Sequence, residues 1–429
     1  MERVTFLRAK AADFRALVAW LAVELTRLRP DLPEHVNVLD RLEGNLKDVR
    51  SRLSRLDAIV VAIEGSQNAT LVPRAMTLVH ILEGITSQVA VTYLPALQRQ
   101  GEADRFIRGV LLGAAQSGGL TWLRNIVARL DGPHAAVVSL EVMPIIYAPP
   151  RHAASLVDMP GLYHELGHAV YAHEPGISGA LRAAVASYYE HQRRQAGHLT
   201  AEKRAARDVT LRDAEAYWTD ARLAELFCDI FATVVCGPAH YVSFADLALR
   251  HSEEPFTIGG RPHPPLCARA HACYQTLTLP QRQEPLVKHV AAAWDAHERA
   301  HTAAHEYAIT CNDVLIDALV EAARSEIART LPTLTPYRTP PPPPDALTAI
   351  APDVTIEGLL NQAAALLFLA PAAYAAWEPL AMQACARLAA EAAARHTERL
   401  GMAKEGTATA AGPGLPYTPP TSATRIVRG

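Results

Sequence analysis

The stretch Tyr163-His164-Glu165-Leu166-Gly167-His168-Ala169-Val170 carries two histidines at the spacing of one helical turn, with a glutamate after the first. On a helix His164 and His168 lie one above the other on one face, so both imidazoles can reach a single zinc ion. Glu165 points into the same cleft, where it can act as general base on a water that the metal has acidified. The flanking residues are apolar, as in a half-buried helix with one polar stripe: Leu162, Leu166, Ala169 and Val170.

The same HExxH pattern occurs a second time, at His297-Glu298-Arg299-Ala300-His301. Here the cation Arg299 would lie beside a metal dication, and the surrounding sequence is strongly polar. We interpret this second match as a solvated helix face that carries histidines. A secondary metal site is the alternative.

A third protein ligand is expected in the segment 221–232, where Glu225 and Asp229 lie four residues apart among apolar side chains. Two carboxylates on one face of a buried helix are unfavourable unless positive charge pairs with them. A zinc ion bound by Glu225, with Asp229 accepting the Nδ1 proton of a ligating histidine, satisfies both charges. The alternative is a first helical turn whose acids only cap the helix and remain solvated.

These residues resemble the gluzincins, zinc metallopeptidases in which a second helix carries the zinc glutamate and an aspartate one turn later. Residues 225–238 are also similar to the glutamate helix of the ImmA-type regulatory peptidases, although the interval from His168 to Glu225 is longer here. The resemblance covers residues 137–274 and indicates the superfamily, not one family. Three short motifs carry it: His164, Glu165 and His168; Glu225 with Asp229; and His263-Pro264-Pro265-Leu266 with Arg269, which is similar to a stretch of the CaaX-processing enzymes.

The resemblance implies a zincin-like core with a small sheet before the motif helix. It also implies that His263 stabilises the oxyanion, with Arg269 as the orienting residue or second cation. The alternative is a loop histidine without a catalytic part. Weaker candidates for the same role are Tyr163, Tyr241 and His240, whereas His173 lies too far past His168 to be a fourth ligand.

Composition indicates a soluble intracellular enzyme. The chain has 429 residues, which is typical of two or three domains, and 41 Lys plus Arg against 44 Asp plus Glu, so nucleic acid is not an expected partner. The six cysteines form no CxxC pair and are expected to be reduced, buried thiols. The first residues contain no apolar h-region and no segment is long enough to span a bilayer, so we expect a cytoplasmic protein without a membrane partner.

We expect a helical N-terminal region over residues 1–130. Apolar residues recur every three or four positions across residues 36–63, and this heptad stripe fits either one helix of an intramolecular bundle or a homodimeric coiled coil. The metallopeptidase core is expected over residues 131–332, with a charged helical insertion at 178–222 that could cover the cleft. Residues 142–148 are interpreted as a buried strand, with strand addition by a peptide substrate as the alternative.

The C-terminal part contains five consecutive prolines at positions 340–344. We expect a stiff Pro-rich linker over residues 333–347. An Ala-rich helical segment over residues 348–403 should follow, packed as a small bundle or folded back on the core. The tail at 404–429 has few large apolar groups and is expected to be disordered.

Together these patterns predict a mainly α fold with a small β-sheet (α+β): a zincin-like core between helical extensions. The predicted function is that of a zinc endopeptidase, a hydrolase in which His164, His168 and Glu225 bind Zn2+. Its substrate would be one dedicated intracellular protein, and a co-encoded regulator is a candidate partner. The alternatives are a non-catalytic zincin-like scaffold and a metal-dependent amidohydrolase that acts on a non-peptide substrate.

Overall fold

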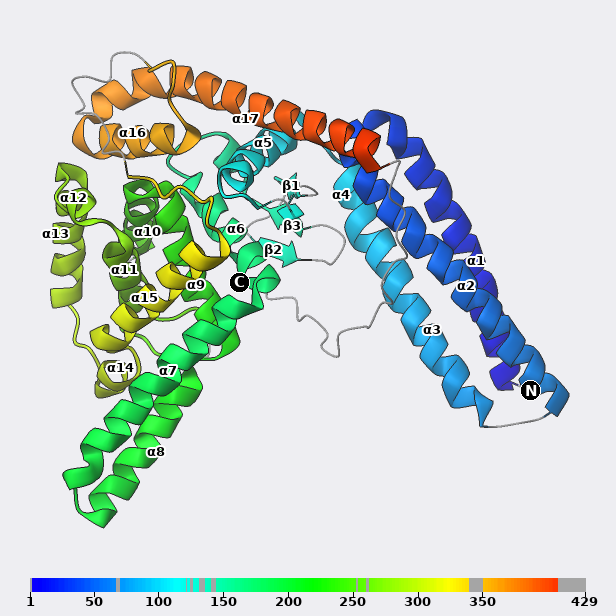
Figure 1. The fold of residues 1–429 in the computed structure, drawn as a ribbon, viewed down its shortest axis with the longest axis horizontal. Coiled ribbons are helices and arrows are strands. Elements are labelled where there is room, and N and C mark those ends of the chain that lie inside the picture. The colour runs from blue at the N-terminus through cyan, green and yellow to red at the C-terminus, as the bar shows by residue number, and fades with distance from the viewer. Residues whose placement is uncertain are drawn as a thin grey trace. The chain divides into compact units, whose positions relative to one another are not determined.

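The computed structural model of the chain is helical over most of its length (Figure 1). It confirms a mainly α fold with a small sheet. Among the residues that it describes, no helix is both long and apolar enough to cross a bilayer. The described residues are 2–66, 70–120, 122–123, 126–130, 136–139, 144–251, 254–259, 262–338 and 350–407.

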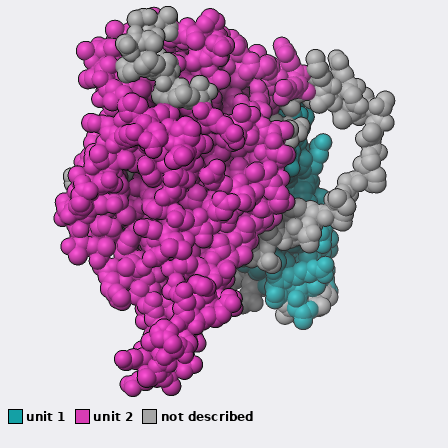
Figure 2. All heavy atoms as spheres, turned by 60° about the vertical axis from the view of Figure 1, so that its left-hand side comes forward, with its two compact units in different colours: residues 1–104, 127–129, 140–145 teal, residues 105–126, 130–139, 146–429 magenta. Residues whose placement is uncertain are grey.

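The chain divides into two compact units, which Figure 2 draws in two colours. Unit 1 comprises residues 1–104, 127–129 and 140–145, and unit 2 comprises the rest. The helices of unit 1 are α1 (Glu2–Leu28), η1 (Arg29–Asp31), η2 (Pro33–His35), α2 (Val36–Ser66), α3 (Leu71–Ser87), the π-helix η3 (Gln88–Tyr93) and α4 (Leu94–Gln98).

Unit 1 is built on α1, α2 and α3, which pack against one another. The heptad stripe of α2 is buried in this contact: Leu39, Leu42, Leu46, Val49, Leu53, Leu56, Val60 and Ile63. Ion pairs join the helices at their rims, from Arg8 to Glu64 at 2.7 Å and from Lys10 to Glu83 at 2.8 Å. The stripe therefore belongs to an intramolecular bundle and is covered by the chain's own helices, so it is not exposed for the coiled-coil alternative.

Unit 2 contains the predicted core and the C-terminal helices. Several of its helices begin with proline, whose missing N–H has no partner at that position in any helix. Its elements are α5 (Glu102–Ser117, from Arg105 on), η5 (Pro150–Ala153), α6 (Pro160–His173), α7 (Pro175–Gln195), η6 (Ala196–His198), α8 (Ala201–Tyr217), α9 (Asp220–Cys236), α10 (Pro238–His251), α11 (Leu266–Thr276), α12 (Leu279–Arg282), α13 (Pro285–Arg299), α14 (His305–Thr310), α15 (Asp313–Thr330), α16 (Ile356–Leu369) and α17 (Pro371–Thr407).

Helix α9 lies at the centre of unit 2, in contact with α6, α7, α10, α11 and α15. Its side chains are buried on nearly every face, as the apolar sequence of residues 223–236 predicts. The helix ends at Gly237, whose φ of 64° is favourable only for glycine. A helix enclosed in this way fixes the side chains that it carries, because no neighbour can move without leaving a cavity.

Helix α6 approaches α9 most closely at Gly167. A Cβ atom at this position would lie 2.9 Å from the Cα of Cys228, which is closer than real Cβ contacts. Glycine is therefore required here so that the backbones of α6 and α9 can meet. This approach brings the HExxH face of α6 against the Glu225 face of α9.

The strands β1 (Val127–Arg129), β2 (Ala136–Ser139) and β3 (Pro144–Tyr147) form one sheet in the order β1-β3-β2. Because β3 is the middle strand and Pro144, Ile145 and Ile146 are buried, it is a structural strand. Strand addition, the alternative for residues 142–148, would need an edge strand. Residues 140–143 lie outside the described part of the chain.

The predicted insertion at 178–222 forms α7, α8 and the first turn of α9. Helices α7 and α8 pack side by side as a hairpin, and α7 also contacts α15, α9 and α6 (Figure 1). That this hairpin covers the cleft stays a prediction. Arg193 of α7 joins the two helices through ion pairs with Asp208 and Glu215 of α8. These ion pairs are half-buried. Three buried side chains lie on the same two helices: Tyr189, Leu211 and Ala214.

The C-terminal helices α16 and α17 fold back on the rest of unit 2. The buried amide of Asn361 accepts a hydrogen bond from the Ala239 N–H and donates one to the Cys236 carbonyl. Gly109 of α5 contacts the backbone of Ala389 in α17, and α5 therefore belongs to unit 2 and not to the predicted N-terminal region of residues 1–130. Residues 339–349, which contain the proline run, and the tail 408–429 lie outside the described residues.

Replacing Gly167 by alanine should separate α6 from α9. We expect Gly167→Ala to lower the free energy of unfolding by about 1–3 kcal/mol, because the added methyl group has no space. The matched control is Gly179→Ala on α7, where nothing lies within 4 Å of the new Cβ. The control should raise helix stability by up to about 1 kcal/mol. Denaturant unfolding measures both, and equal effects would contradict the proposed contact.

Candidate metal centre

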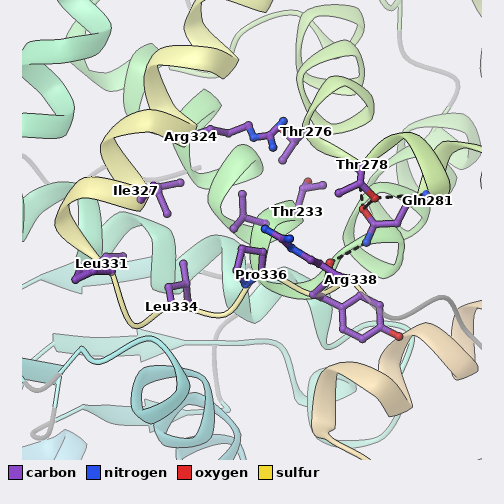
Figure 3. Close-up of a pocket in the computed structure, with 14 residues that line it drawn as sticks. Thr233, Thr276, Thr278, Gln281, Arg324, Ile327, Leu331, Leu334, Pro336 and Arg338 are labelled. Carbon is purple, nitrogen blue, oxygen red and sulfur yellow. Dashed lines mark hydrogen bonds between the residues drawn. The ribbon is translucent and has the colours of Figure 1, made fainter.

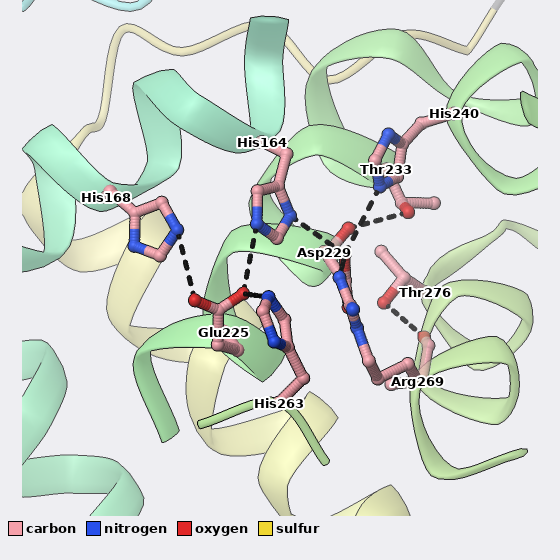
Figure 4. A network of polar contacts seen from close by, with 10 residues as sticks. His164, His168, Glu225, Asp229, Thr233, His240, His263, Arg269 and Thr276 are labelled. Atoms are coloured by element: carbon pink, nitrogen blue, oxygen red, sulfur yellow. Dashed lines mark hydrogen bonds and ion pairs between the residues drawn. The ribbon is translucent and has the colours of Figure 1, made fainter. Parts of the chain in front are cut away.

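Two helices supply the predicted site residues in unit 2. Helix α6 carries His164, Glu165 and His168, and α9 carries Glu225 and Asp229. Figure 4 shows the two histidines pointing from α6 toward the carboxylates of α9. The His164–His168 pair of α6 thus faces the Glu225–Asp229 pair of α9 where the two helices pack together.

The carboxylate of Glu225 is the centre of this group. Its Oε2 lies 3.2 Å from His164 Nε2 and 3.2 Å from His263 Nε2, and its Oε1 lies 3.5 Å from His168 Nε2. Two ligands bound to one zinc ion at about 2.0–2.1 Å in tetrahedral geometry are separated by about 3.3–3.4 Å. The observed separations are close to this value, and the two at 3.2 Å also lie at the upper end of the hydrogen-bond range of about 2.7–3.2 Å.

Asp229 orients His164 from the opposite side. The Nδ1 of His164 lies 2.9 Å from Asp229 Oδ1, and Arg269 of α11 donates to both carboxylate oxygens, at 2.6 Å and 3.0 Å. His240 Nε2 also lies 3.6 Å from Oδ1. With Nδ1–H donating to Asp229, His164 directs Nε2 toward Glu225, where a bound metal ion would replace the proton on that atom. Arg269, predicted as orienting residue or second cation, acts on the aspartate.

The pKa values describe how the charges of His164, Glu225 and Asp229 stabilise one another. Burial alone would lower the pKa of His164, but Asp229 and Glu225 raise it to about 10. Burial would raise the pKa of Glu225, yet its contacts with His164 and the nearby His168 lower it to about 2. Arg269 and His164 hold the pKa of the buried Asp229 carboxyl well below its usual range. Both carboxylates are therefore ionised inside the protein.

Glu165 differs from the other carboxylates of the site. It is buried, and burial raises its pKa to about 7, against the opposing effect of His164. A carboxyl group with a pKa near neutrality can both accept and return a proton. His168 is the counterpart: burial and the charge of His164 lower its pKa to about 4, which leaves a neutral imidazole.

Zinc fits this donor set. Oε2 of Glu225 is buried and makes no hydrogen bond within the described residues, although two imidazole nitrogens lie 3.2 Å away. The contact between His164 Nε2 and Glu225 Oε2 holds either the imidazole proton, in accord with the pKa of about 10 for His164, or a metal ion in its place. Two imidazoles with one carboxylate are ligands that zinc takes in catalytic sites, where a fourth position stays open.

Two other groups of donors lie close enough to hold a metal, His164 with His168 and Cys228, and His164 with Asp229 and His240. Cys228 suits a metal less well, because burial raises the pKa of its thiol well above the usual value. Asp229 is already neutralised by Arg269. Glu225, whose carboxylate faces both His164 and His168, is the third ligand that the sequence predicts.

His263 lies on the segment between α10 and α11, of which residues 254–259 and 262–265 are described. Arg222, one turn before Glu225 on α9, donates to the Gly259 carbonyl at 2.9 Å. The same guanidinium lies 4.0 Å from the ring centre of Tyr217 and donates to the Tyr217 carbonyl. Arg222 thus connects the metal helix to the segment that presents His263.

Two further contacts fasten this segment. The Pro255 carbonyl accepts from the Cys267 N–H at 2.9 Å, and the Phe256 ring packs edge-on against Tyr307 with centres 4.9 Å apart. The side chain of His263 is 36% exposed, which is the highest value among the residues around Glu225. The site therefore opens to solvent at His263.

The remaining candidates lie elsewhere or play other parts. The Tyr163 hydroxyl donates to Glu357 at 3.0 Å, Tyr241 is buried in an apolar cluster and His173 stacks on Trp122. His240 contacts Asp229 and not the Glu225 group. Tyr163, Tyr241 and His173 therefore point away from the group around Glu225.

The second HExxH match does not form a comparable centre. Its glutamate, Glu298, accepts hydrogen bonds from Trp294 and Cys267, and helix α13 ends at Arg299, before His301. The Nδ1 of His301 faces the carbonyl of His297 at 2.8 Å. Among the described residues His297, Glu298 and His301 belong to no group of three metal donors, and all three are half-buried.

Sequence reasoning did not identify Arg222 or the close contact at Gly167. The role of Arg222 depends on Gly259, which lies far along the chain, and no spacing rule connects the two. Gly167 carries a weak signal, since a glycine inside a helix is unfavourable without a packing reason.

Removing the Arg222 side chain should loosen the segment that carries His263. We expect Arg222→Ala to accelerate hydrogen exchange of the Cys267 amide by about tenfold or more, because the bonds of Arg222 that hold the segment are lost. This amide donates to the Pro255 carbonyl of the segment. The control is Arg212→Ala on α8, which removes an exposed cation paired with Asp208. Exchange that is unchanged in Arg222→Ala, or changed equally in the control, would refute this role.

Comparison with known proteins does not assign the chain to a family. No protein-family model, no curated protein and no solved structure matches the chain.

Proposed function

We propose that the protein is a zinc-dependent peptidase of gluzincin type. The observation that carries the proposal is the ionised, buried carboxylate of Glu225, with the Nε2 atoms of His164, His168 and His263 within 3.5 Å. A zinc ion would take the place of the proton that His164 shares with Glu225, and the donors around this point are those that zinc prefers. His164, His168 and Glu225 are the proposed ligands, within a zincin-like core.

Zinc, when bound, supplies Lewis-acid polarisation of a carbonyl and acidifies water at neutral pH. Glu165 is the residue that takes the proton from the attacking water and passes it to the leaving amine, since its pKa lies near 7. His263 is placed on the solvent side, where its ring N–H can donate to the oxygen of the attacked carbonyl. Asp229 and Arg269 hold His164 in the required tautomer.

Glu165 also favours an enzyme over a non-catalytic scaffold. A buried carboxyl whose pKa is raised to about 7 destabilises the fold at neutral pH, and a purely structural metal site has no use for it. We extend the proposal to an endopeptidase that acts on a dedicated intracellular protein, with a co-encoded regulator as a candidate partner. The exposure of His263 gives a substrate access to the centre.

The test compares zinc content and peptide hydrolysis in matched variants. We expect Glu225→Ala to lose zinc, and Glu165→Gln to keep it while kcat/KM falls by about 10²–10⁴-fold, because only proton transfer is removed. Glu298→Gln, which changes the glutamate of the second HExxH match, is the control and should keep both. Zinc is measured by elemental analysis and hydrolysis by mass spectrometry of a diverse peptide library.

Three results separate the possible functions. Zinc that survives Glu225→Ala would contradict the ligand set. Full activity in Glu165→Gln would contradict the general base. A wild type that holds zinc but cleaves no peptide would favour the scaffold or an amidohydrolase on a non-peptide substrate.

A further inference from the structure

Unit 2 contains a cavity away from the metal centre, with a volume of about 300 Å³. It lies at the C-terminal end of α9, between α15, the α11–α12 junction and the extended residues 332–338 (Figure 3). This volume is at the lower end of the range for small-molecule sites, which is about 300–1,000 Å³. The cavity can therefore accept a small organic ligand.

The charged side chains that line this cavity are both cationic. Figure 3 shows them coming from two elements, Arg324 from α15 and Arg338 from the extended segment. Within the described part of the chain neither guanidinium has an ion-pair partner, and no carboxylate lines the cavity. Both arginines are exposed to solvent, so the missing partner alone does not require a ligand. At this cavity, however, their guanidinium groups remain available to bind a carboxylate or phosphate through paired hydrogen bonds.

The wall that carries Arg338 is held in place by hydrogen bonds. The Tyr337 N–H donates to the Val234 carbonyl at 3.0 Å, and the Gln281 amide donates to the Tyr337 carbonyl at 2.8 Å. A Cβ on Gly237 would lie 2.5 Å from the Tyr337 ring, so the segment packs directly on the glycine that ends α9. The cavity is thus formed before any ligand binds.

The rest of the lining suits a ligand with an apolar part. Ile327, Leu331 and Leu334 form one side, and the hydroxyl groups of Thr233 and Thr276 lie on the other elements. Both hydroxyls donate to backbone carbonyls of their own helices, those of Asp229 and Ala272. Toward a ligand they can therefore only accept a hydrogen bond. The anionic head must then be held by the two arginines.

We propose that this cavity binds a small anion that carries an apolar group, either a carboxylate or a phosphate monoester. The site is independent of the proposed peptidase function. It lies on the same helix as the metal ligands, since Thr233 follows Glu225 by eight residues, a rise of about 12 Å. A ligand in the cavity stabilises the end of α9.

Titration calorimetry at constant ionic strength tests this site, with benzoate and phenyl phosphate as probes and neutral benzyl alcohol for comparison. We expect saturable binding of at least one anionic probe and none of benzyl alcohol. Arg324→Gln/Arg338→Gln should weaken binding by about tenfold or more, because charge-assisted hydrogen bonds are lost. The control is Arg299→Gln, the same charge change at an exposed residue of α13 outside the cavity.

Ala328→Phe offers a second test that keeps both arginines. Ala328 lines the cavity, and the larger side chain fills it, so binding should be lost while zinc content is unchanged. The proposal is overturned if neither anion binds to the wild type. It is also overturned if binding persists in both the double variant and Ala328→Phe, or falls equally in Arg299→Gln.

Discussion

The two buried carboxylates of α9 are the constraint on which the rest of the site depends. Glu225 and Asp229 are ionised and enclosed, and an unpaired buried charge costs several kcal/mol. Arg269 donates a hydrogen bond to each carboxylate oxygen of Asp229. His164 lies between the two acids and contacts both. Without a metal, the charge of Glu225 is balanced by protonated His164; a metal dication bound there would take the place of that proton.

Packing follows from this charge arrangement. Imidazoles can reach α9 only if α6 lies directly against it, and Gly167 permits that approach because it has no side chain. Arg269 reaches from α11, and Arg222 holds the segment before α11 that presents His263. Helices distant in sequence are thus joined through polar groups that would be unfavourable in any other arrangement.

Much of the local structure could be predicted from the sequence, because it depends on short-range spacing. The four-residue steps of His164–His168 and Glu225–Asp229 place each pair on one helix face, and the heptad stripe of α2 predicts its buried side. Which elements pack together depends on long-range contacts that no such pattern encodes. The sequence thus left open whether the α2 stripe is covered by its own chain, and it did not indicate that α7 packs on α15 and α9.

The central claim is that Glu225, and not Cys228, completes the metal site with His164 and His168. X-ray absorption spectroscopy of the zinc-loaded protein at the zinc edge tests it most directly. The account predicts a shell of nitrogen and oxygen atoms at about 2.0–2.1 Å, with imidazole scattering and no sulfur. A sulfur atom at about 2.3 Å would contradict it and assign the third ligand to Cys228.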